Sequence, residues 1–159
     1  MPITVTNCAG TSAPVRMQKA AVAPGLLAPA SFNAGGKQYL VALFSDGVTY
    51  VGNPGLVAGA NFMPAAPGNV ITSYGIGFGN VVPPIAPGVV VGQATNIPNL
   101  TIAFGTTPAT VNYAGLAPQA VGLYQFNYVV PNVPDGDYAM NFELNSSPVP
   151  QTVYLTVHQ

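Results

Sequence analysis

Hydrophobic and polar residues alternate along the C-terminal half of the chain, which predicts a series of short β-strands. The segments 122–130, 136–144 and 151–157 each carry a large apolar side chain at every second position. In the first of these segments, the apolar face holds three aromatic residues that we expect to be buried together: Tyr124, Phe126 and Tyr128. No segment shows a sustained helical period. The pattern therefore favours an all-β protein.

Further segments of this half also have the character of strands. Residues 69–74 and 89–93 predict single strands, and residues 100–104 and 109–114 predict a hairpin across the intervening Gly and Pro. Short strands over roughly 90 residues, with turn signals about every 8 to 12 residues, are typical of an antiparallel sandwich. We therefore expect an immunoglobulin-like β-sandwich over residues 65–159.

The residues Asp135-Gly136-Asp137-Tyr138 lie where the penultimate strand of this sandwich begins. A tyrosine at this place suits a tyrosine corner, in which the hydroxyl group bonds back to the backbone a few residues upstream. The Cys-Trp-Cys core of antibody domains is absent, because the chain has one Cys and no Trp. We expect Tyr, Phe and aliphatic side chains to hold the sheets together instead.

The first 64 residues are predicted to form an additional N-terminal β segment. Residues 38–44 and 48–51 flank a Ser-Asp-Gly turn and predict a hairpin, in which Gly47 supplies the positive φ that such turns require. Two more short strands are expected, at 3–6 and 13–19. Because a two-stranded hairpin is too small to be stable alone, we expect residues 1–64 to pack against the sandwich.

The chain carries very little charge: three Lys or Arg, four Asp or Glu and one His in 159 residues. Between Asp46 and Asp135 there is no formal charge at all. This composition leaves few side chains for general acid–base catalysis, so no catalytic residue is expected. The three cations form no basic patch, which disfavours nucleic-acid binding. Gly and Pro interrupt the neutral region too often for membrane insertion.

Cys8 is the only cysteine, so the chain cannot form an intramolecular disulfide, and the cysteine content leaves the cellular compartment open. The N-terminal residues also lack the basic region and apolar run of a signal peptide. No basic residue adjoins Cys8, so we do not expect a reactive thiol.

Three further features have a chemical interpretation and a structural one. The run from Gly75 to Gly79 looks superficially like a dinucleotide-binding loop, but no helix or acidic residue follows at the required spacing, so a bent strand is expected. Asp135 and Asp137 have too few oxygen donors near them in sequence for calcium, and a turn is expected. His158 has no acid or serine near it in sequence, and no Gly-x-Ser-x-Gly motif occurs. The sequence thus predicts no metal site and no cofactor.

Three runs of the sequence are distinctive: Val22-Ala-Pro-Gly-Leu26, Pro67-Gly-Asn-Val-Ile-Thr-Ser-Tyr-Gly-Ile-Gly-Phe-Gly79 and the segment from Thr110 to Pro131. Together they resemble an uncharacterised family of immunoglobulin-like domains at the C-termini of secreted bacterial proteins, acidobacterial ones especially. The strand followed by a Gly-rich bend is also similar to the immunoglobulin-like modules of plexins and some transcription factors. The family resemblance implies an extracellular, modular and non-catalytic role. The abrupt start makes residues 3–19 a candidate for the end of a preceding repeat.

We therefore expect a non-catalytic extracellular or cell-surface module for structural spacing, adhesion or protein contact. Its expected partners are protein domains of the same or a neighbouring chain. The alternative is a carbohydrate-binding module, because sugar-binding sites often combine aromatic rings with amide side chains. Tyr113 and Tyr154 are the candidate glycan-binding residues, since Tyr124 and Tyr128 are expected in the core.

Overall fold

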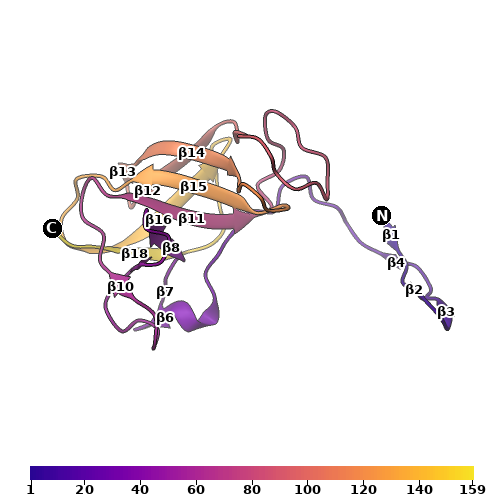
Figure 1. The fold of residues 1–159 in the computed structure, drawn as a ribbon, viewed down its shortest axis with the longest axis horizontal. Helices are drawn as coiled ribbons and strands as arrows, with labels where there is room; N and C mark the ends of the chain where they lie inside the picture. The colour runs from indigo at the N-terminus through magenta and orange to yellow at the C-terminus, as the bar shows by residue number, and fades with distance from the viewer.

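The computed structural model describes residues 1–159, and almost all of its regular structure is β-strand (Figure 1). The one helical element is a 3-10 turn, η1, at Ala30–Phe32. The structure contains no helix with the length and apolar character needed to cross a membrane. The prediction of an all-β protein is confirmed.

Two main sheets form the body of the protein. The larger sheet has the order β10-β9-β8-β11-β15-β14, and β5 also pairs with β11. Its strands are β5 (Gly25–Leu26), β8 (Ala42–Phe44), β9 (Tyr50–Val51), β10 (Phe62–Met63), β11 (Val70–Ile76), β14 (Thr110–Leu116) and β15 (Tyr124–Val129). All of its pairs are antiparallel except β9 with β10.

The smaller sheet is entirely antiparallel, with the order β13-β12-β16-β17 and β18 also paired to β16. Its strands are β12 (Leu100–Phe104), β13 (Thr107–Pro108), β16 (Gly136–Leu144), β17 (Ser147–Pro148) and β18 (Tyr154–Val157). The longest strand, β16, pairs with β12 along one half and with β18 along the other, so it organises this sheet.

The pairing of β11 with β15 decides which side chains face the interior. Ile71 lies opposite Tyr128, and Ser73 lies opposite Phe126. All four side chains are buried, and Tyr124 at the end of β15 is buried as well. Because side chains of a strand alternate between its two faces, one register places this whole set inside. The predicted burial of the three aromatic residues of β15 is confirmed.

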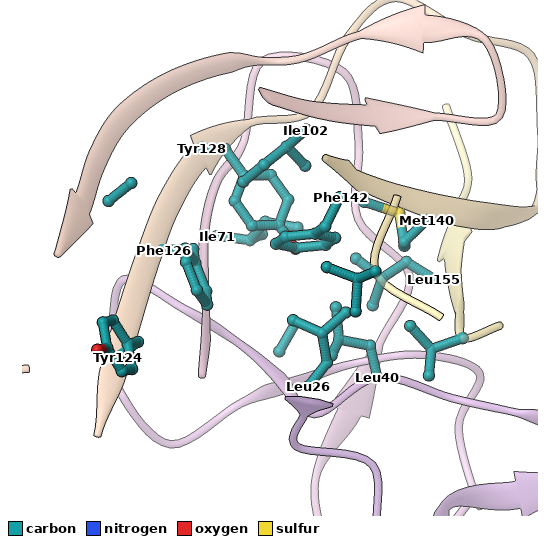
Figure 2. Packing of buried hydrophobic residues seen from close by; sticks show 14 of the residues in the cluster. Leu26, Leu40, Ile71, Ile102, Tyr124, Phe126, Tyr128, Met140, Phe142 and Leu155 are labelled. Atoms are coloured by element: carbon teal, nitrogen blue, oxygen red, sulfur yellow. The ribbon is translucent and has the colours of Figure 1, made fainter. Parts of the chain in front are cut away.

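Aromatic rings of the smaller sheet meet this face and join the two sheets (Figure 2). The ring of Phe142 in β16 lies edge-on to those of Phe126 and Tyr128, with centroids 5.4 and 6.1 Å apart. Phe104 in β12 contacts Tyr128 in the same way at 6.1 Å. Each such pair contributes about 0.5 to 1.5 kcal/mol beyond the burial of area. Aromatic packing thus joins the sheets without a disulfide.

A tyrosine corner forms at the start of β16. The Tyr138 hydroxyl group donates a hydrogen bond of 2.8 Å to the backbone carbonyl of Pro134, four residues upstream. The ring of Tyr138 also lies edge-on to Phe104 at 6.3 Å. The predicted tyrosine corner is confirmed, and it attaches the loop before β16 to the core.

Residues 25–63 add strands to the larger sheet and a small second core. The predicted hairpin is present in a shorter form, with Leu43 opposite Tyr50 and with Gly47 at a φ of 71° in the turn. The strand predicted at 38–44 begins only at Ala42, because Gln38 pairs with Asn33 instead. A separate pair, β6 (Asn33–Ala34) and β7 (Lys37–Gln38), follows η1. The small core contains four buried residues: Phe32, Tyr39, Val41 and Phe62. Because β8 pairs directly with β11, strands on both sides of residue 64 share one sheet.

Two predictions for strands between residues 89 and 114 need correction. The strand predicted at 89–93 is absent, since this segment is part of a loop that follows three prolines. The hairpin across Gly105 is limited to two residue pairs of β12 and β13, and the chain then crosses to the larger sheet, where β14 pairs with β15. The Ala109 N–H donates a last hydrogen bond of 2.9 Å to the Ile102 carbonyl before the chain leaves β12.

Residues 1–20, which we call the arm, project away from the two sheets (Figure 1). Within the arm, β1 (Pro2–Ile3) pairs with β4 (Val15–Arg16), and β2 (Thr6–Asn7) pairs with β3 (Gly10–Thr11). Every residue of the arm is exposed. The strands predicted at 3–6 and 13–19 are therefore present only as short pieces of a two-stranded ribbon.

Candidate functional site

The Asp46 carboxylate stabilises the hairpin turn between β8 and β9. It accepts a hydrogen bond of 2.7 Å from the Thr49 hydroxyl group and bonds of 3.0 Å from the backbone N–H groups of Thr49 and Val48. These hydrogen bonds, the Thr49 hydroxyl first among them, lower the pKa of Asp46 below its ordinary value. The charge of Asp46 is thus used within the turn itself.

The carboxylates of Asp135 and Glu143 lie at the surface. One oxygen of Asp135 lies 3.3 Å from Nε2 of His158, and the other accepts a 2.8 Å hydrogen bond from the backbone N–H of Gln159. These contacts attach the end of the chain to the loop before β16. Glu143 is exposed on β16, in the register opposite Thr101 of β12. His158 is therefore beside a carboxylate, which its position in the sequence did not reveal.

Asp137 links the smaller sheet to the segment around β7. Its Oδ2 accepts hydrogen bonds from Lys37 Nζ at 2.8 Å and from the Tyr39 hydroxyl group at 2.9 Å, and its Oδ1 accepts one of 2.7 Å from the Thr156 hydroxyl group. Burial by itself would raise the pKa of Asp137, but the hydrogen bonds from Lys37, Thr156 and Tyr39 outweigh it and lower this pKa. Asp137 is consequently held in its charged form.

Two tyrosines lie beside Lys37 and Asp137. Burial, together with the hydrogen bond that it donates to Asp137, raises the pKa of Tyr39 to about 12. Lys37 Nζ lies 5.3 Å from the centre of the Tyr154 ring, in a cation–π contact. The ring of Tyr154 is half-buried and also packs against Tyr39. Tyr154, a glycan candidate from the sequence, thus already has a cationic partner within the chain.

Tyr113, the other glycan candidate, belongs to β14 in the larger sheet, whereas Tyr154 belongs to β18 in the smaller one. Its hydroxyl group donates a 2.7 Å hydrogen bond to the backbone carbonyl of Leu116. Its ring borders a hollow of about 260 Å³ that also contains three amide side chains, those of Asn96, Asn99 and Asn112. The structure therefore places amide groups around Tyr113 and does not bring the two tyrosines into one site.

A second hollow, of about 350 Å³, lies between the proline-rich loop at 79–89 and residues 116–124. We call it the proline-loop hollow. Its walls include apolar side chains of both segments, and none of its lining residues is charged: Ile85, Val89, Leu116, Val121 and Tyr124 are among them. Val89 and Val121 are 50% and 52% exposed at its edge. The sequence analysis did not predict this hollow. The valines that lie among the prolines of the loop were the pattern that could have indicated it.

The glycine-rich run after β11 permits a close approach of two backbone segments. At Gly77, where φ is +76°, a Cβ atom would lie 2.1 Å from the carbonyl oxygen of Ala23. At Gly79, where φ is +86°, it would lie 3.0 Å from Cγ2 of Val22. The Ala23 N–H also donates a 2.9 Å hydrogen bond to the Gly77 carbonyl. The expected bend is confirmed, and the run holds the base of the arm beside the proline-loop hollow.

The three aspartates are thus used in separate structural contacts. No group of three or more His, Cys, Asp and Glu side chains gathers anywhere in the structure. The two hollows described above have neutral linings, which suits the binding of neutral surfaces better than proton transfer. Comparisons with protein-family models, with curated proteins and with solved structures found no match.

Proposed function

We propose that this chain is a non-catalytic immunoglobulin-like module of an extracellular or cell-surface bacterial protein, used for structural spacing, adhesion or protein contact. The immunoglobulin-like assignment is supported by the antiparallel pairing, by the aromatic contacts between the two sheets and by the tyrosine corner at Tyr138. The extracellular assignment is supported by the resemblance of the three sequence runs to domains of secreted bacterial proteins.

The distribution of exposed apolar side chains carries the proposal of protein contact. Most of the large ones belong to the arm, to its base or to the surroundings of the proline-loop hollow: Met1, Ile3, Val5, Val15, Met17, Val22, Ile76, Val82, Val89, Val90 and Val121. Contiguous apolar surface is costly to leave in water and is typical of interaction sites. This end of the molecule is therefore the proposed contact surface.

Protease treatment of intact cells tests the location. Cells that make the native protein are treated with a protease and probed with an antibody against this chain. We expect the signal to disappear from intact cells while a cytoplasmic marker survives. Retention of the signal until the cells are lysed would contradict an extracellular or cell-surface role.

A screen for hydrolase and lyase activities tests the non-catalytic assignment. We expect no turnover above that of a heat-treated sample. Turnover that is abolished by single substitutions at Asp135, Asp137, Glu143 or His158 would overturn the assignment, because these titratable side chains belong to the smaller sheet or adjoin it.

Carbohydrate binding is the second candidate function, and the surroundings of Tyr113 favour it. The half-buried Tyr113 and three asparagines line one hollow, which offers an aromatic side chain together with hydrogen-bond donors and acceptors. A glycan array with the wild-type chain and with the Tyr113→Ala and Tyr154→Ala variants tests this. We expect a glycan ligand, if bound here, to be lost with Tyr113→Ala and kept with Tyr154→Ala. Absence of binding to every glycan would remove this candidate.

A further inference from the structure

The arm makes its hydrogen bonds within itself. The backbone N–H of Met17 donates to the Met1 carbonyl, and that of Ser12 donates to the Val5 carbonyl, both at 2.9 Å. The first backbone bond to the body beyond the arm is that of Ala23 with Gly77. Two-stranded ribbons are marginally stable in water unless a third strand or an apolar surface covers them. The arm therefore requires a surface that its own body does not provide here.

One face of the arm is apolar. Ile3 and Val15 lie opposite each other across the ribbon, as do Met1 and Met17, so their side chains share a face. By alternation along the strand, Val5 belongs to the same face. These five side chains are between 41% and 67% exposed. In an extended chain the five residues from Met1 to Val5 span about 17 Å, which is the length of the apolar face.

The charges of the arm and the body have opposite signs. The arm contains two cationic side chains, Arg16 and Lys19, and no acidic one. Residues 21–159 contain one Lys and four acids, which gives them a formal charge of −3. Two bodies repel each other, whereas an arm is attracted to a body, and this favours contact between the arm of one molecule and the body of another.

The place where the arm leaves the body also favours a second copy as the partner. Val22, at the base of the arm, leaves little room for a Cβ atom at Gly79, which lines the proline-loop hollow. The arm then runs outward from the two sheets (Figure 1). Val89 and Val121 at the edge of the hollow remain about half exposed. In a two-fold pair, each arm crosses to the hollow of the other molecule. One interface then covers the apolar arm face and the proline-loop hollow of both copies.

We propose that this chain forms a reciprocal dimer in which the apolar face of each arm covers the proline-loop hollow of the other copy. The proposal rests on the protein-contact role given above and names the partner as a second copy of the chain. Hydrophobic burial supplies the free energy of association. The opposite charges of arm and body favour this pairing over contact between two bodies.

Sedimentation velocity over a concentration series tests the dimer. We expect the full chain to approach twice its mass of 16.2 kDa. Ile3→Asn in the arm and Val121→Asn at the hollow should each weaken self-association by about tenfold or more, because each removes a buried aliphatic side chain from the interface. Val48→Asn is the matched control, since Val48 is 68% exposed in the β8–β9 turn, and it should leave the dimer unchanged.

Cross-linking from Cys8 decides which body the arm contacts. Cys8 is the only cysteine and is exposed at the turn of the arm, so a maleimide-linked benzophenone labels the arm alone. In a mixture of ¹⁴N- and ¹⁵N-labelled chains, we expect dimers that join one light and one heavy chain, and the Val121→Asn variant should reduce their yield.

Two results would overturn the proposal. Sedimentation as a monomer at every soluble concentration would exclude the dimer, and cross-links confined to single chains would show that the arm folds back onto its own body. In either case the proposed location and the non-catalytic assignment would be unaffected, because protease treatment of intact cells and the activity screen test them separately. Circular dichroism of each variant checks that the body is folded. We expect a folded body, because the substituted side chains are exposed.

Discussion

Asp137 shows how one charged side chain connects distant parts of the chain. Its partners Lys37 and Tyr39 are 100 and 98 residues away in the sequence, and Thr156 is 19 residues away. The side chain of Asp137 is only 17% exposed, so its hydrogen bonds replace much of its hydration. Removal of the carboxylate would leave three donors without their acceptor.

We expect Asp137→Ala to lower the free energy of unfolding by about 2 kcal/mol, since hydrogen bonds to a charged group are stronger than neutral ones and Lys37 can regain water. Urea denaturation measures the change. Asp135→Ala is the control and should cost at most about 0.5 kcal/mol, because its contact with His158 is exposed. Equal losses in both variants would contradict the structural role of Asp137.

Two hydroxyl groups in the core have the opposite character. The oxygens of Tyr128 and Ser73 are buried and have no hydrogen-bond partner of ordinary geometry. The contact of Tyr128 with Ser73 only partly offsets the rise that burial causes in the pKa of Tyr128. The cost of leaving a buried hydroxyl group without a partner is about 1 to 3 kcal/mol. The ring of Tyr128 is required for contact with Phe104 and Phe142, but its hydroxyl group is not.

Tyr128→Phe should therefore leave stability unchanged or increase it by up to about 1 kcal/mol. Tyr138→Phe is the matched substitution and should cost about 1 kcal/mol, because it removes the hydrogen bond to the Pro134 carbonyl. Thermal and urea unfolding of the two variants measure the difference. A destabilised Tyr128→Phe protein would mean that its hydroxyl group has a partner in solution, such as a buried water.

At the scale of elements, alternation predicted the strands well where a strand has one buried face. The strands β11, β15 and β16 lie where the pattern predicted them, because each contributes one face to the core between the sheets. The segment 89–93 has apolar residues, but its backbone pairs with a distant segment only at Val91, which bonds to Gln119 and Ala120, and it remains a loop. The crossing of the chain after β13 was also missed, since alternation does not specify which neighbour a strand pairs with.

Gly77 and Gly88 provide a matched test of the contact between β11 and the base of the arm. Both have positive φ, but a Cβ at Gly88 meets nothing within 4 Å, whereas one at Gly77 meets the Ala23 carbonyl. We expect Gly88→Ala to cost about 1 to 2 kcal/mol from backbone strain alone, and Gly77→Ala to cost about 3 kcal/mol or more. Urea denaturation gives these values, and faster hydrogen exchange at the Ala23 amide should accompany only Gly77→Ala. Similar behaviour of both variants would argue against the close approach.

At the scale of the whole molecule, the scarcity of charge predicts an unusually simple pH dependence. The pKa values of Asp46 and Asp137 are lowered in the folded state, so their stabilisation is present above the unfolded value of about 4 and is lost as the pH falls below it. The pKa of Tyr39 is raised to about 12. Its stabilisation is complete below the unfolded value of about 10 and is lost as the pH rises from there through the folded value.

We therefore expect a broad plateau in the free energy of unfolding, with an acid limb below about pH 4 and an alkaline limb between about pH 10 and 12. Urea denaturation across the pH range measures it. Tyr39→Phe should reduce the alkaline limb without abolishing it, because burial also raises the pKa of Tyr128. An alkaline limb that is identical in the wild type and in Tyr39→Phe would contradict this assignment.

The sequence by itself determined the strand character of the chain, the buried faces of the main strands and the turns at Gly47 and Tyr138. These are local properties, because side-chain alternation and turn conformation depend on residues close in sequence. Only the tertiary structure decided which sheet each strand joins, where Asp137 finds its partners, how the proline-loop hollow forms and that the arm stands apart. Those features depend on contacts between residues far apart in the chain, which hydrophobic burial selects from many pairings that the same local pattern permits.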